Sequence, residues 1–97
     1  MHNESFYLDF NDVTGDTLKD YTTSILITIK SRLYNNQFAH KPFMIVSTDV
    51  VSGIHDSLKT FLFDSNKTMG FYVDYSFENR ADSQYCEITQ VKVSLCL

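Results

Sequence analysis

The sequence predicts one small α+β domain, a two-layer sandwich in which two helices pack on one face of a four-stranded mixed sheet. The 97 residues, 43% of them hydrophobic, are enough for one core but not for two. Stretches with the two-residue period of strands alternate with stretches of helical period, in the order β-α-β-α-β-β. A right-handed crossover at the start and a hairpin at the end place both helices on the same face. Residues 1–97 are therefore treated as a single domain.

The first strand is predicted around Phe6, Leu8 and Phe10, which alternate with polar residues. A turn follows, and Asp16 stands at its end, where a carboxylate can accept backbone N–H bonds and cap a helix. From about Thr17 to Asn35 the apolar residues recur at spacings of three and four, with no Gly or Pro. This pattern predicts the first helix.

The middle of that helix also fits a strand. Ile25, Ile27 and Ile29 alternate, and a stretch rich in Thr and Ile has strand propensity. We favour the helix because the three- and four-residue spacing continues through Leu33.

Pro42 favours an extended entry to Phe43–Val46, a continuous apolar run typical of a strand buried on both faces in the middle of a sheet. All three residues from 47 to 49 can cap the helix that follows. Gly53 weakens this helix, and we expect another backbone to lie close to it. The apolar stripe of the helix consists of Val51, Ile54, Leu58, Phe61 and Leu62.

The last two strands form a hairpin around a polar turn from Asn79 to Gln84. Cys86 and Cys96 have the same parity on the final strand, so they lie too far apart for a disulfide and are expected as free thiols of a reducing compartment. The inward row of the first strand of the hairpin is Phe71, Val73, Tyr75 and Phe77, and that of the second is Val91, Val93, Leu95 and Leu97.

The face of the sheet opposite the helices is then expected to be bare. Tyrosine is enriched in protein interfaces, because it offers a large amphipathic contact area at low entropic cost. A docking surface and an ordinary solvated sheet face are the two competing interpretations. The candidate protein-binding residues on this face are Tyr7, Asp9, Tyr72, Asp74 and Glu78, and Ser76, Gln90, Lys92 and Ser94 share it.

The charge of the chain argues against binding to phosphate backbones. Twelve acidic side chains against eight basic ones give a net charge of -4, whereas affinity for nucleic acid comes largely from Lys and Arg. A weak nucleic-acid binder centred on Lys30, Arg32 and Lys41 remains as an alternative.

Catalytic and metal motifs are not predicted. His40 and His55 are residue types of general acid-base phosphodiester chemistry, but their spacing does not bring them together. A small hydrolase or nuclease using this pair is kept as the alternative from the enzyme class. The aspartates at positions 9, 12, 16 and 20 miss the spacing of a calcium loop, so neither a metal nor a cofactor is expected.

The leading functional hypothesis is a non-enzymatic interaction protein, either an inhibitor or adaptor of another protein or an oligomeric building block. A domain of this size is marginally stable, which favours self-association. The composition suits a small acidic accessory protein of a phage or mobile element. No apolar run reaches the roughly 18–20 residues of a membrane span, and no signal peptide is present, so a soluble cytoplasmic protein is expected.

Overall fold

A computed structural model describes residues 2–13, 15, 17–36, 39–64, 70–79 and 82–96, for residues 62–64 the backbone only. The strand order is β1-β3-β4-β2, antiparallel except for the parallel pair β2 and β4. The predicted element order and mixed sheet are thus confirmed. The elements are β1 (His2–Asp9), the short 3-10 helix η1 (Phe10–Asp12), α1 (Leu18–Asn35), β2 (Phe43–Val46), α2 (Thr48–Asp64), β3 (Gly70–Asn79) and β4 (Tyr85–Cys96).

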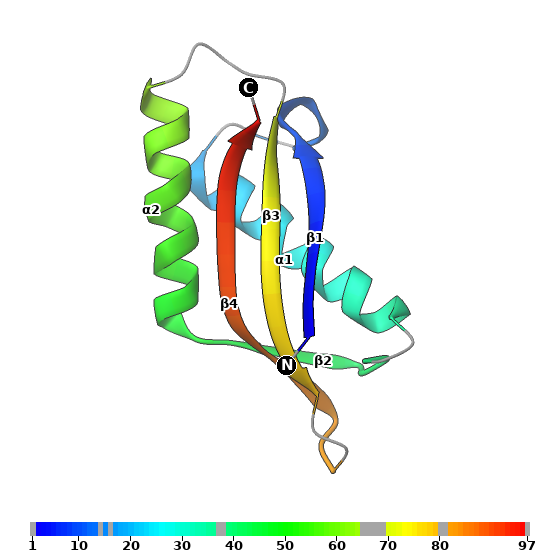
Figure 1. The fold of residues 1–97 in the computed structure, drawn as a ribbon. Helices are drawn as coiled ribbons and strands as arrows, with labels where there is room; N and C mark the ends of the chain where they lie inside the picture. The colour runs from blue at the N-terminus through cyan, green and yellow to red at the C-terminus, as the bar shows by residue number, and fades with distance from the viewer. Residues whose placement is uncertain are drawn as a thin grey trace.

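Both helices pack on one face of the sheet, as predicted. In Figure 1, α1 crosses behind the strands and α2 lies beside β4. The apolar row of β3 is fully buried at the centre of the core. The fully buried side chains are Ile25 and Ile29 of α1, Ile54 and Leu58 of α2, Phe71, Val73, Tyr75 and Phe77 of β3, and Cys86 of β4.

The stretch that also fitted a strand is helical, because Ile25, Ile29 and Leu33 form one buried stripe. The cap of α1 is Thr17, so the prediction of Asp16 as the cap was wrong; Asp16 itself lies outside the described residues. The Thr17 hydroxyl accepts from the Asp20 N–H at 3.2 Å, and the Asp20 carboxylate accepts from the Thr17 N–H at 3.3 Å. This reciprocal capping box satisfies two backbone donors, which a single aspartate cap would not do.

The prediction that Phe43–Val46 is a central strand was wrong. β2 is the last strand of the sheet, and β4 is its only neighbour in the described part of the chain. Met44 and Val46 pack against the core on one side of β2, whereas Phe43 and Ile45 on the other side remain 55% and 44% exposed. A continuous apolar run does not distinguish a central strand from an edge strand, because it does not show whether the second face of the strand is buried.

A β-bulge changes the direction of β4. Ser76 of β3 lies opposite Gln90, but the next residue, Phe77, lies opposite Ile88, which leaves Thr89 as an extra residue. Such an insertion bends its strand and increases the local twist. The lower part of β4 is curved in Figure 1, and β2 pairs with the first residues of β4, before the bulge.

The bulge also reverses the parity of the final strand. Cys86 faces the core, whereas Cys96 lies on the other face of β4, so the expectation of equal parity was wrong. Both cysteines are free thiols, as predicted. Burial raises the pKa of the Cys86 thiol, and the nearby Lys41 opposes this shift. Leu97, predicted to end the inward row, lies outside the described residues.

Gly53 has open space around it. A Cβ at this position would find no atom within 4 Å, so the expected close approach of another backbone is wrong. Gly53→Ala should therefore raise the free energy of unfolding by about 0.5–1 kcal/mol, because alanine loses less backbone entropy in a helix. Urea denaturation measures this change.

Gly70→Ala is the matched control for that substitution. Its Cβ would lie 2.5 Å from the Leu8 carbonyl oxygen, so the same change is expected to destabilise the domain at Gly70. A lower free energy of unfolding for Gly53→Ala would contradict our assignment of Gly53 as an unconstrained helix position.

Candidate protein-interaction surface

The open face is the surface of the sheet opposite the helices. Strand register places its side chains in rows across neighbouring strands, from the end of β3 near Gly70 to the turn after Asn79. The rows, in that order, are Tyr7, Tyr72 and Ser94; Ser5, Asp74 and Lys92; Asn3, Ser76 and Gln90; Glu78, Glu87 and Ile45; and Tyr85 with Phe43.

The predicted tyrosines meet at one end of the open face. Tyr7 and Tyr72 are directly opposite in register, and their ring centroids are 5.4 Å apart in an edge-on arrangement. Both rings remain more than 40% exposed. The Tyr7 hydroxyl donates to the Asp9 carboxylate at 3.4 Å. Partial desolvation and the charge of Asp9 raise the pKa of Tyr7 above its ordinary value.

The other two predicted binding residues lie further along β3. Asp74 is half-buried and stands opposite Lys92, an oppositely charged pair in register. Glu78 is at the far end of the face, opposite Glu87. The structure therefore brings Tyr7, Asp9 and Tyr72 together and places Glu78 in a different part of the face.

Ser76 was expected to be bare and is instead buried, with 6% of its surface exposed. Its hydroxyl accepts a hydrogen bond from the Asn3 side-chain amide at 3.0 Å. This polar contact joins β1 and β3 in the middle of the open face, between its two apolar ends.

A second apolar group at the far end was missed by the sequence reasoning. It consists of Phe43, Ile45 and Tyr85, which we call the β2 patch, and Tyr85 is 46% exposed. Two errors concealed it: β2 was assigned to the middle of the sheet, and the bulge was not foreseen. The sequence did contain a signal of the bulge. The polar open-face positions 90, 92 and 94 are even-numbered, whereas the polar residues Tyr85 and Glu87 are odd-numbered, so strict alternation does not continue through the strand.

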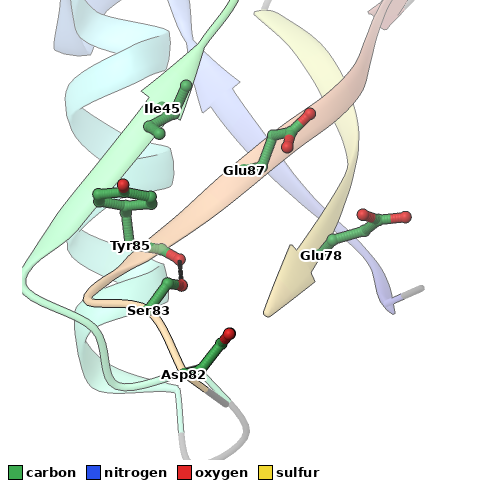
Figure 2. A pocket seen from close by; sticks show the side chains of 6 residues that line it. All are labelled: Ile45, Glu78, Asp82, Ser83, Tyr85 and Glu87. Carbon is green, nitrogen blue, oxygen red and sulfur yellow. Dashed lines mark hydrogen bonds between the residues drawn. The ribbon is translucent and has the colours of Figure 1, made fainter. Parts of the chain in front are cut away.

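The β2 patch borders a hollow of about 180 Å³. In Figure 2, Tyr85 and Ile45 lie on one side of the hollow, and the carboxylates of Glu78, Asp82 and Glu87 lie around its other sides. The Ser83 hydroxyl donates to the Tyr85 carbonyl at 3.0 Å, which orders the turn below the ring. The Lys41 ammonium donates to the Ser83 carbonyl. The residues that line the hollow are Ile45, Glu78, Asp82, Ser83, Tyr85 and Glu87.

Two of the three basic residues considered for nucleic-acid binding make contacts within the domain. Arg32 stacks over the Phe6 ring at 5.3 Å, and its Nε donates to the Tyr75 hydroxyl at 3.3 Å. Lys41 is engaged at the hollow, and Lys30 is an exposed residue of α1. Arg32 and Lys41 are therefore used in contacts within the domain.

His40 lies between α1 and β2, and His55 lies on α2. The His40 backbone has φ of 44°, its N–H donates to the Leu33 carbonyl at 3.1 Å, and its Nδ1 lies 2.7 Å from the Tyr34 carbonyl oxygen. These contacts terminate α1. His55 is half-buried on α2, which follows β2 in the sequence. The described residues contain no group of three His, Cys, Asp or Glu side chains that could hold a metal ion.

Comparison with protein-family models, curated proteins and solved structures finds no significant match for this chain. In the described part of the chain, neither helix has the length and apolar character needed to cross a membrane.

Proposed function

We propose that this chain is a non-enzymatic protein-protein interaction module that docks through the open face of its sheet. One observation carries the proposal: large apolar side chains are exposed at both ends of a face that no described helix covers. Fully burying an exposed apolar side chain contributes about 1.5–3 kcal/mol. These side chains are about half exposed, so a partner gains about half of that value from each of them, at the two ends of the face. The exposed side chains are Tyr7, Tyr72, Phe43, Ile45 and Tyr85.

The composition of the face also supports a protein partner. Aromatic residues are enriched in interface cores, and charged residues form the rim that orients the partner. Here carboxylates such as Asp9 and Glu87 stand beside the aromatic rings. The role is that of an inhibitor or adaptor, or of a building block in an oligomer. We also propose a cytoplasmic location, since both cysteines are free thiols, the state that a reducing compartment maintains.

Site-specific photo-crosslinking tests the proposal. p-Benzoylphenylalanine replaces either Tyr72 or Phe43 on the open face, and illumination is carried out in the native cell. Each position should give a discrete crosslinked product, because a docked partner lies within reach of the side chain. Mass spectrometry of the product distinguishes a second copy of the chain from another protein.

Tyr34 supplies the matched control. It is 53% exposed on α1, which lies on the other side of the sheet, so the same replacement there should give no such product. Equal crosslinking from Tyr34 and Tyr72, or none from either open-face position, would refute the interaction face.

A further inference from the structure

The outer edge of β2 has no neighbouring strand in the part of the chain that the structure describes. The Phe43 N–H donates to the Gln84 carbonyl at 3.3 Å, so the backbone groups of Phe43 point toward β4. Successive residues of a strand point their backbone groups to alternate edges. Those of Met44 and Val46 consequently point to the outer edge, where they can pair with an added strand.

This edge is short, but it lacks the other features that keep edge strands from pairing. Protected edges are very short, or they carry charged residues, proline or a bulge within the strand, and β2 has four residues. β2 has the sequence FMIV, without a charge, and its open-face side chains Phe43 and Ile45 are exposed. Lys41 and Pro42 stand just before the strand, so they limit the length of an added segment to a few residues.

The charges beyond β2 determine what kind of segment fits. The hollow carries the carboxylates of Glu78, Asp82 and Glu87, and the Lys41 ammonium at its margin is engaged by the Ser83 carbonyl. Arg80, in the same turn, lies outside the described residues. The hollow therefore complements a cationic group, and the carboxylates are not grouped as metal ligands.

The spacing of a sheet allows an added strand to reach this hollow. Neighbouring strands are about 4.8 Å apart, so a strand added to β2 lies about 10 Å from β4. An arginine or lysine side chain on its open-face side would cross Ile45 and meet Glu87. The aliphatic stem of such a side chain packs on apolar surface while its charged end stays at a polar site. Tyr85 offers a ring face for a guanidinium group.

We infer that the β2 edge binds an extended basic segment of a partner protein, whose backbone adds a strand to the sheet and whose arginine or lysine enters the hollow. This inference rests on the proposed function and specifies the partner. A second copy of the chain fits less well, since the net charge is -4 and paired β2 edges would bring the same carboxylates together.

The test titrates the full chain with an acetylated and amidated peptide that alternates valine and arginine. We expect binding that weakens with salt, and we expect the amides of Met44 and Val46 to become protected from hydrogen exchange. Two comparison peptides should not bind: one with glutamate for arginine, which reverses the charge, and one N-methylated at alternate residues, which blocks backbone pairing.

Matched variants distinguish the effect of the net charge of the chain from the effect of carboxylates placed at the hollow. Glu78→Gln combined with Glu87→Gln should weaken binding about tenfold, because two of the three carboxylates of the hollow lose their charge. Asp56→Asn combined with Asp12→Asn removes as many charges elsewhere and should leave the affinity within about twofold. Asp56 is an exposed residue of α2, and Asp12 is an exposed residue of η1.

Absence of binding, equal binding of the glutamate peptide, or binding without protection of Met44 and Val46 overturns the inference. The crosslinking result then decides the wider proposal. Products from Tyr72 and Phe43 would keep the interaction face with a different mode of docking. If those crosslinked products are absent as well, both the inference about the β2 edge and the proposed interaction face are refuted.

Discussion

Phe71→Ala is expected to lower the free energy of unfolding by about 3–5 kcal/mol. Phe71 is fully buried in β3, and its ring centroid lies 5.3 Å from that of Phe10 and 6.4 Å from that of Tyr21. The substitution removes the ring that joins η1 to α1, and the surrounding side chains can close only part of the cavity. Native proteins are stable by about 5–15 kcal/mol in total, so this loss is a large fraction of the stability of the domain. Urea denaturation followed by circular dichroism gives the value.

Tyr72→Ala is the control from the next residue of the same strand. Tyr72 points to the open face and is 48% exposed, so its loss should change stability by less than about 1 kcal/mol. Similar losses for both variants would contradict the assignment of Phe71 to the core and Tyr72 to the open face.

Tyr75→Phe should change both the stability of the domain and its dependence on alkaline pH. The Tyr75 hydroxyl donates to the Glu4 carboxylate at 2.6 Å and accepts from Arg32. Removing it leaves one oxygen of a half-buried carboxylate without that donor, which costs about 1–3 kcal/mol at neutral pH. Unfolding by urea at pH 7 measures this loss.

Burial, followed by the hydrogen bond to Glu4, raises the pKa of Tyr75 from 10.0 to about 12. Its contribution is therefore fully present below pH 10, where the tyrosine is neutral in both the folded and the unfolded chain. Between pH 10 and 12 the unfolded chain ionises first, and stability falls with rising pH. Tyr75→Phe should reduce this alkaline decline.

Tyr34→Phe, at an exposed position on α1, is the control for that experiment and should change the free energy of unfolding at pH 7 by less than about 0.5 kcal/mol. A residual decline is expected in the Tyr75→Phe variant, because the pKa of Tyr7 is also raised. An unchanged alkaline decline in Tyr75→Phe would show that Tyr75 does not titrate as described.

The candidate surface was predictable at one end only. Tyr7 and Tyr72 follow from strict alternation on β1 and β3, and the structure places their rings in contact. Phe43, Ile45 and Tyr85 were missed because their exposure depends on the order of the strands. Ser76 was predicted to be bare because its contact with Asn3 joins residues far apart in the sequence.

Local patterns by themselves determined the fold class. The two-residue period of β3 and the three- and four-residue spacing of α1 each report which side of an element is apolar, and that side must be buried. They also predicted two helices on one face, since the apolar rows of the strands need a common cover.

Only the tertiary structure decided which strand lies at the edge, where the bulge in β4 falls and which carboxylates gather around the hollow. These features depend on contacts between β2, β3 and β4, which are distant in the sequence. A pattern of apolar residues gives the period of an element but not its neighbours. The physical reason is that strand pairing is set by the packing of the whole sheet against α1 and α2.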